Sequence, residues 1–427
     1  MADIQPFAAW HYDPTRVNPA DVLTEPYDKI SPALQATYYN RSPHNFVRIE
    51  LGWEEPFDSA QGKAGDKYQR AAESLSAWRK EKILIQHPRP AFYHYEQTFS
   101  WADGPAHTRR AILARVRLTP FSEGVVLPHE HTLAKPKADR MSLLRATQVF
   151  TGQIFLLYDG QKVQLPSLTG NTIFEYSDEH NIQHRLAAIT DNLTPAFANA
   201  KLYVADGHHR YETAIAYRDE RRGHAPPTPD APYEYVMAAL VDYRDPDLLI
   251  LPTHRVIKNV SNFDAEKLHE RLLEHFQMER HPDLMRLQEH LDRTPNGAHC
   301  FGMFLPPNNF WLLRLRQNVD RARFFADKPP LWDNLDVAIL HGVILEPLLG
   351  IGEEQLRQQT NVDYFRDASD ATRKVEKSEA QAAFFLNPTP VESVIAVADA
   401  RSRMPQKSTD FYPKFPSGLT LYDVSGK

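Results

Sequence analysis

The stretch that decides the fold reads Leu202-Tyr203-Val204-Ala205-Asp206-Gly207-His208-His209-Arg210-Tyr211-Glu212-Thr213-Ala214. Its apolar first residues predict a short strand, Gly207 permits a tight turn, and the residues from Tyr211 to Arg222 predict a helix. A helix that begins directly after a strand points its free backbone N–H groups and the positive end of its dipole at one spot. Such a spot favours a bound phosphate.

The side chains of this turn suit a phosphorylated ligand. Arg210 can make a bidentate contact to phosphate oxygens, and His208 and His209 offer donors or acid/base groups that change charge near neutral pH. Asp206 could cap the helix, accept a proton from a substrate hydroxyl or bind Mg²⁺. An Asp-Gly pair before a helix is common as a simple cap. Folding does not, however, require two histidines and an arginine at a helix N-terminus, where positive charge is opposed by the helix dipole. We therefore interpret the turn as functional.

Bulk composition narrows the class of protein. A chain of 427 residues predicts two or three domains, and the net charge of -6 gives no support to nucleic-acid binding. The single cysteine, Cys300, excludes an intramolecular disulfide and a cysteine-based zinc site. The first residues lack the layout of a signal peptide, and no apolar run approaches the ~20 residues that span a bilayer. We expect a cytoplasmic protein without nucleic-acid or membrane partners.

Periodicity predicts an α+β fold with mixed sheets. Residues 91–99 and 110–118 read as a strand pair, and residues 46–51 read as a half-buried strand because apolar and polar residues alternate. Residues 150–157 and 161–165 read as a hairpin around Asp159-Gly160. The character of the chain changes after Val256. We expect an α+β region over 1–255 that holds the turn and an α+β region over 256–427 that completes the cleft.

Further ionisable residues are candidates for the site. His129, Glu130 and His131 precede Lys137 and Arg140, which is typical either of a His-x-His metal site, of an acid/base pair near phosphates or of a polar surface loop. In the turn Glu25-Pro26-Tyr27-Asp28 a carboxylate could activate a hydroxyl, although no spacing rule prefers Glu25 to Asp28 or Glu50. Arg255 ends a strand, where an anion site can form. The loop from Met404 to Lys414 has no predicted role.

The turn resembles the signature of the ParB/sulfiredoxin superfamily, in which a Gly-x-x-Arg loop grips nucleotide phosphates, and Gly207-His208-His209-Arg210 fits it. The Asp-Gly-His-His-Arg form is most similar to the branch of ADP- or ATP-dependent free serine kinases. His208 stands where the sulfiredoxin branch needs a cysteine, and the Gly-Glu-Arg-Arg of the chromosome-partitioning branch is absent. Over almost the whole chain the pattern resembles the family catalogued as domain of unknown function 1015. This second resemblance rests on four segments: Pro26-Tyr27-Asp28, His129-Glu130, Pro252-Thr253-His254-Arg255 and Met404-Pro405-Gln406-Lys407-Ser408-Thr409.

This resemblance implies a ParB/sulfiredoxin-like core, ADP or ATP as cofactor, Mg²⁺, and a small hydroxylated or phosphorylated metabolite as substrate. The residues expected to act in catalysis are Asp206, His208, His209, Glu25 and Glu130. The residues expected to bind the nucleotide are Gly207, His208, His209, Arg210, His129, Lys137, Arg140 and Arg255.

Two alternatives to this phosphotransferase stay open. One is a metal-dependent hydrolase, such as a phosphatase, with His129, His131, His208 and Asp206 as ligands. The other is a nucleotide sensor without catalysis. The sequence does not predict the acceptor, the metal or the oligomeric state.

Overall fold

The computed structural model describes residues 1–54, 66–102, 104–132, 134–166, 168, 170–223, 228–295, 297–329 and 331–426, without the side chains of Ala134 and Lys135. Helices and several sheets are mixed along the chain, which confirms the predicted α+β class. The chain forms two compact units. The first comprises residues 1–128, 132–249 and 413–427, and the second comprises residues 129–131 and 250–412. Within the described ranges, every helix is too short or too polar to cross a lipid bilayer.

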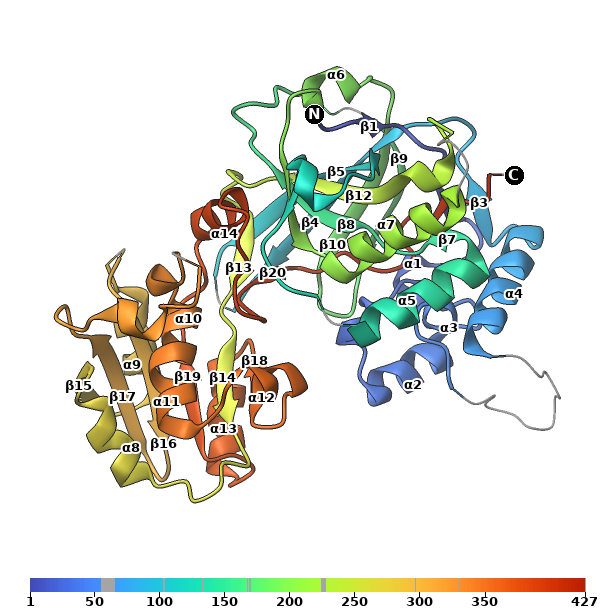
Figure 1. The fold of residues 1–427 in the computed structure, drawn as a ribbon. Helices are drawn as coiled ribbons and strands as arrows, with labels where there is room; N and C mark the ends of the chain where they lie inside the picture. Colours follow the sequence, from blue (N-terminus) through green and yellow to red (C-terminus); the bar gives the residue numbers. More distant parts are fainter. Residues whose placement is uncertain are drawn as a thin grey trace. The chain divides into compact units, whose positions relative to one another are not determined.

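The first unit is built on a mixed sheet (Figure 1), which has nine strands among the described residues. The strands, in sheet order, are β6 (Val126–Pro128), β11 (Leu202–Asp206), β8 (Ile154–Tyr158), β12 (Tyr235–Asp242), β5 (Ala106–Arg117), β4 (Phe92–Ser100), β10 (Gln183–Ile189) and β9 (Gly170–Ser177), with β1 (Ile4–Gln5) on β5. β11 runs parallel to β6 and antiparallel to β8, so the strand that leads into the turn lies inside the sheet. The predicted pair at residues 91–99 and 110–118 is confirmed as β4 and β5.

Two predicted strands of this unit are wrong. Residues 161–165 form no strand, because β8 is already flanked on both sides by β11 and β12 and has no edge left for a hairpin partner. Residues 47–50 form the short helix α3 (Val47–Glu50) rather than a strand. Its Val47, Ile49 and Glu50 side chains are all buried, so the alternation at this segment does not separate a buried face from an exposed one.

Three helices of the first unit pack beside one another: α4 (Lys67–Lys80), α5 (Ala134–Thr147) and α7 (His208–Arg222) (Figure 1). The end of the chain also belongs to this unit, since β21 (Tyr422–Asp423) pairs with β7 (Val149–Phe150). The segment just before β21 therefore runs through the first unit.

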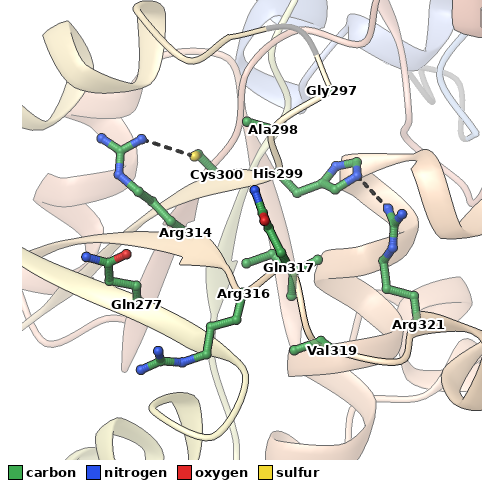
Figure 2. A pocket seen from close by; sticks show the side chains of 11 residues that line it. Gln277, Gly297, Ala298, His299, Cys300, Arg314, Arg316, Gln317, Val319 and Arg321 are labelled. Atoms are coloured by element: carbon green, nitrogen blue, oxygen red, sulfur yellow. Dashed lines mark hydrogen bonds between the residues drawn. The ribbon is translucent and has the colours of Figure 1, made fainter.

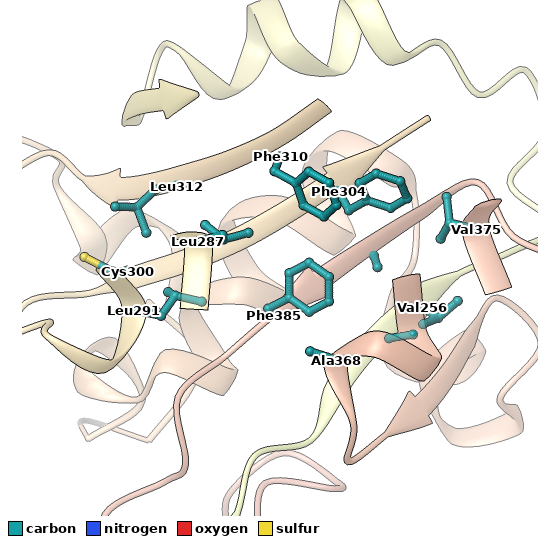
Figure 3. Close-up of a cluster of buried hydrophobic side chains, with 12 residues drawn as sticks. Val256, Leu287, Leu291, Cys300, Phe304, Phe310, Leu312, Ala368, Val375 and Phe385 are labelled. Atoms are coloured by element: carbon teal, nitrogen blue, oxygen red, sulfur yellow. The ribbon is translucent and has the colours of Figure 1, made fainter. Parts of the chain in front are cut away.

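The second unit has a sheet in which every neighbouring pair of strands is antiparallel. Its order among the described residues is β15 (Phe276–His281), β17 (Asn309–Leu315), β16 (Cys300–Leu305), β19 (Ala382–Phe385), β14 (His254–Ile257) and β18 (Val362–Phe365). The helices α9 (Leu284–Asp292) and α13 (Ala368–Glu376) pack on this sheet. Figure 3 shows the buried cluster between them, where Leu287 and Leu291 of α9 meet Phe304, Leu312 and Phe385 of the strands. Cys300 lies in this cluster as a core residue.

Candidate functional site

The predicted strand, turn and helix at residues 202–222 are confirmed. β11 ends at Asp206, Gly207 adopts a left-handed conformation with φ of 92°, and α7 begins at His208. This φ is costly for any residue with a Cβ. The N-cap residue is Gly207, which has no side chain to accept a hydrogen bond from the first N–H groups of the helix. The N-terminus of a helix of this length is a place where an anion is favoured by the helix dipole.

The Arg210 guanidinium packs closely against two glycines and the backbone carbonyl of Gln153. Its Nη1 donates a hydrogen bond to the Gln153 carbonyl at 2.8 Å. A Cβ on Gly207 would lie 3.1 Å from Arg210 Nη2, and a Cβ on Gly152 would lie 3.0 Å from Nη1. Both glycines therefore make room for the guanidinium, which stays one-fifth exposed.

Asp206 is surrounded by positive charge. Its carboxylate lies 3.0 Å from Lys414 Nζ and 3.9 Å from Arg210 Nη2. Burial raises the pKa of the Asp206 carboxyl, but Lys414, Arg210 and Lys29 outweigh it and hold the pKa well below its usual range. A carboxylate with such a low pKa is a weak proton acceptor. Asp206 is therefore better suited to holding the surrounding cations in place than to accepting a proton from a substrate.

A buried arginine adds to this positive region. Arg109 lies on β5 with only 1% of its surface exposed, between the rings of Phe155 and Phe415 at 4.9 and 4.4 Å. It donates to Gln97 Oε1, and Gln97 Nε2 in turn donates to the Lys414 carbonyl at 3.0 Å. Arg109 Nε and Nη1 have no hydrogen-bond partner.

The positive charge of Arg109 interacts electrostatically with the Asp206 carboxylate. Burial lowers the pKa of Arg109 to about 9, while the Tyr95 hydroxyl and then Asp206 act to raise it. Four cations (Lys414, Arg210, Lys29 and Arg109) thus act on one carboxylate.

The N-terminal turn predicted from Glu25 to Asp28 lies in the same unit and close to these cations. Burial raises the pKa of Tyr27 to about 12, and Arg140 and Arg210 both act on its hydroxyl. The Thr24 carbonyl accepts a hydrogen bond from the Ser417 N–H at 2.8 Å, which ties this turn to the segment that carries Lys414. The structure therefore brings the N-terminal turn, the 206–210 turn and the C-terminal segment together.

Glu25 has a histidine as its ionic neighbour. Its Oε1 lies 3.5 Å from His180 Nε2, and this carboxylate raises the pKa of His180. Glu25 and Arg109 both act electrostatically on the Tyr95 hydroxyl, so they lie around the same ring. Glu25 is about one-quarter exposed.

Lys137 and Arg140, both expected to bind the nucleotide, form ion pairs within the protein. Lys137 Nζ lies 2.8 Å from Glu212 on α7. Arg140 is buried, pairs with Glu50 at 3.2 Å and with Asp139, and stacks over the Tyr27 ring at 4.2 Å. Both cations thus have carboxylate partners within the protein, and their role in nucleotide binding stays a prediction.

His208 and His209 occupy the first turn of α7. His208 is buried and His209 is half-buried. The His209 carbonyl accepts a hydrogen bond from the Thr213 hydroxyl at 2.7 Å, one helical turn later. Both side chains therefore lie at the end of α7 where the helix dipole is positive.

The remaining predicted residues, His129, Glu130, His131 and Arg255, belong to the second unit. His129 Nε2 hydrogen bonds with Thr409 Oγ1 at 3.0 Å, and Glu130 Oε1 accepts the Lys407 N–H at 3.0 Å. His131 is exposed.

Arg255 is fully buried in this unit. It donates to the Lys407 carbonyl at 2.9 Å and to the Thr253 carbonyl. Burial lowers the pKa of Arg255 to about 10, against the opposing effects of Tyr364 and Glu130. The hydrogen-bond acceptors of Arg255 are thus backbone carbonyls, and the nearby carboxylate that acts on its charge is that of Glu130.

The described residues contain one grouping of three metal-ligand side chains, Glu279, His281 and His290. The four ligands of the alternative hydrolase are not part of it. The second unit also has a cavity of about 650 Å³ lined by Arg314, Arg316 and Arg321 among others (Figure 2). None of the predicted site residues is among the residues that line this cavity.

Sequence reasoning missed three residues that surround Asp206: Lys414, Arg109 and Lys29. Lys414 comes from a loop without periodicity, and Arg109 sits in a strand where a charged residue normally faces water. Of the three, only Lys29 could have been found from the sequence, because it directly follows the candidate turn at Tyr27-Asp28. The buried position of Arg109 and the place of Lys414 beside Asp206 follow only from tertiary packing.

The chain belongs to the family described as "Protein of unknown function (DUF1015)", whose pattern matches residues 4–338. No curated protein matches the chain.

Several solved structures share a distant likeness in fold. A free serine kinase in complex with AMP is 14% identical, with 70% of this chain and 86% of that chain covered and a TM-score of 0.36. A conserved hypothetical protein from Pyrococcus furiosus is 13% identical, with 71% and 91% covered and a TM-score of 0.35. A C-terminally truncated SbnI from Staphylococcus aureus is 12% identical, with 70% and 82% covered and a TM-score of 0.34.

Proposed function

We propose that the protein is a nucleotide-dependent phosphotransferase whose first unit binds ADP or ATP phosphates at the turn from Gly207 to Arg210. The observation that carries this proposal is the Arg210 guanidinium in the first turn of α7, beside a carboxylate on which four cations act. In phosphoryl transfer, catalysis is mostly positioning and stabilisation of charge on the transferring group. A guanidinium held in place by its hydrogen bond to Gln153, with three further cations near Asp206, suits both tasks.

Mg²⁺ fits this proposal as a companion of the nucleotide. It usually keeps several waters and is bound by one or two carboxylates together with substrate phosphates. Asp206 is the carboxylate of the turn that would hold it, in competition with Lys414.

Glu25 is the residue we assign to accept the proton of the acceptor hydroxyl. Its carboxylate faces a histidine rather than a Lys or Arg, whereas Asp206 is held ionised by several cations. Serine as the acceptor comes from the resemblance of the Asp-Gly-His-His-Arg motif to free serine kinases. The proposal uses residues of the first unit, and a role of His129, Glu130 and Arg255 in the site stays a prediction.

A thermal-shift panel of ADP, ATP, pyrophosphate and phosphorylated metabolites tests nucleotide binding. A ligand at 100 times its Kd stabilises the folded protein by about 2.7 kcal/mol, which raises the Tm of a unit of this size by about 5 °C. We expect ADP or ATP to give such a shift. If no phosphorylated compound stabilises the protein, the proposal fails.

Turnover with serine and other small hydroxylated acceptors separates the kinase from a nucleotide sensor. For a kinase, Glu25→Gln lowers kcat by about 10²-fold or more, the usual contribution of a general base, with unchanged nucleotide affinity. The matched control Glu175→Gln, an exposed glutamate of the same unit, keeps full activity. A protein that binds ADP or ATP but transfers no phosphoryl group to any acceptor is a sensor instead.

A further inference from the structure

Three side chains of the second unit that the nucleotide site does not use bring their ligand atoms together. Glu279 and His281 are two residues apart on β15, so they point to the same side of the sheet. His290 lies on α9, three residues after the buried Leu287, on the side of the helix that packs against β15 and its neighbours. One oxygen or nitrogen of each of the three residues lies within 4.8 Å of the other two.

The His281 ring has an unsatisfied nitrogen. Its side chain is 4% exposed, and its Nε2 makes no hydrogen bond. A buried polar atom without a partner costs about 1–3 kcal/mol. The nearest carboxylate oxygen, Glu279 Oε1, lies 3.6 Å away.

His290 is oriented as metal-binding histidines usually are. Its Nδ1 lies 2.8 Å from the Arg286 carbonyl, which can only accept, so Nδ1 carries the proton and Nε2 keeps its lone pair. Metal-bound histidines typically donate their second N–H to a carbonyl or carboxylate in this way. The two imidazole rings are 4.5 Å apart between centroids.

We propose that Glu279, His281 and His290 bind one divalent transition-metal ion of the Zn²⁺ class, with water in the fourth position. Zinc bonds of about 2.0–2.1 Å at tetrahedral angles place ligand atoms about 3.4 Å apart. The 3.6 Å between Glu279 and His281 is already close to this value. Glu279 is half-exposed, so its side chain has room to change rotamer when an ion binds. Two imidazoles and one carboxylate favour Zn²⁺ over Ca²⁺ or Mg²⁺, which prefer oxygen ligands.

The bound ion would join β15, the edge strand of the sheet, to α9. It would satisfy the buried His281 Nε2 and stabilise the second unit. This site is separate from the nucleotide site of the first unit and does not depend on the proposed kinase activity.

Titration of the tag-free, chelator-treated full-length protein with Zn²⁺, followed by calorimetry, tests the proposal. We expect one equivalent to bind, and Co²⁺ in its place to give the strong visible bands of a four- or five-coordinate ion. His290→Gln and Glu279→Gln should each weaken Zn²⁺ binding by more than about 10-fold, the scale on which even outer-shell partners change metal affinity. Both residues are partly exposed, so these variants should fold.

His275→Gln is the matched control, because it makes the same substitution in the same unit outside the grouping. It should bind Zn²⁺ as the wild type does. Absence of stoichiometric Zn²⁺ binding by the wild type would overturn the proposal, and so would tight binding that survives both His290→Gln and Glu279→Gln.

Discussion

The turn at Asp206 in the first unit and the segment at His129–His131 in the second unit are equally rich in ionisable residues, yet their charges are arranged differently. Around Asp206, four cations act on one carboxylate. In the second unit, the buried Arg255 donates to the carbonyls of Lys407 and Thr253 and lies near Glu130, whose carboxylate also accepts the Lys407 N–H. Our proposal therefore places the phosphates at the turn, where several cations act on one group, and not simply where ionisable residues are dense.

The two regions also respond to acid through different groups. In the first unit a carboxyl has a lowered pKa because cations surround it. In the second unit, burial lowers the pKa of His254 to about 4, with a contribution from Arg255. The Leu386 N–H lies 3.3 Å from His254 Nδ1, so this nitrogen accepts and the buried ring is neutral.

The largest of the expected stability effects concerns His254. The unfolded chain binds a proton at His254 below the ordinary histidine pKa of 6.5, and the folded protein does so only below about 4. The stabilisation is thus complete above pH 6.5 and is lost as the pH falls toward 4, by about 3 kcal/mol. The stability of the wild type relative to His254→Gln should fall by this amount across that window. Hydrogen exchange of β14 measures it, and an unchanged difference would contradict the account.

The next effect concerns Asp206. Its folded-state pKa lies below the unfolded value of about 3.9, so its stabilisation is present above pH 4 and is lost as the pH falls further. Asp206→Asn should cost about 2 kcal/mol at pH 7, between the values for exposed and buried pairs, and less at pH 3. Urea unfolding measures both. Asp191→Asn, at an exposed loop position, should cost almost nothing at either pH.

The smallest effect concerns Gly207. Gly207→Ala should cost about 1–2 kcal/mol, because a Cβ at φ of 92° strains the backbone and crowds Arg210. Gly223→Ala is the control, since Gly223 also has a positive φ but nothing lies within 4 Å of its Cβ position. Thermal unfolding should show strain in both variants, while only Gly207→Ala should lose ADP affinity. Equal ADP affinity in the two variants would show that Arg210 is not held for a ligand.

The sequence was a good guide where local structure determines geometry. The strand, the glycine and the helix at residues 202–222 follow from periodicity and from the conformational freedom of Gly207, and the β4–β5 pair follows from its alternation. The neighbours of Asp206 were not predictable, because Lys414 lies about two hundred residues away and Arg109 is a buried charge in a strand. The partners of Lys137 and Arg140, Glu212 and Glu50, were likewise not predictable because they are distant in the sequence.

The most direct test of the central claim compares two cation variants in one calorimetric titration with ADP at fixed low salt. Arg210→Ala removes a charged bidentate contact and should weaken ADP binding by roughly 10²-fold or more. Lys407→Ala removes a half-exposed cation of the second unit, whose backbone contacts to Glu130 and Arg255 remain, and should leave the affinity unchanged. Equal ADP affinity in Arg210→Ala and the wild type would contradict the account.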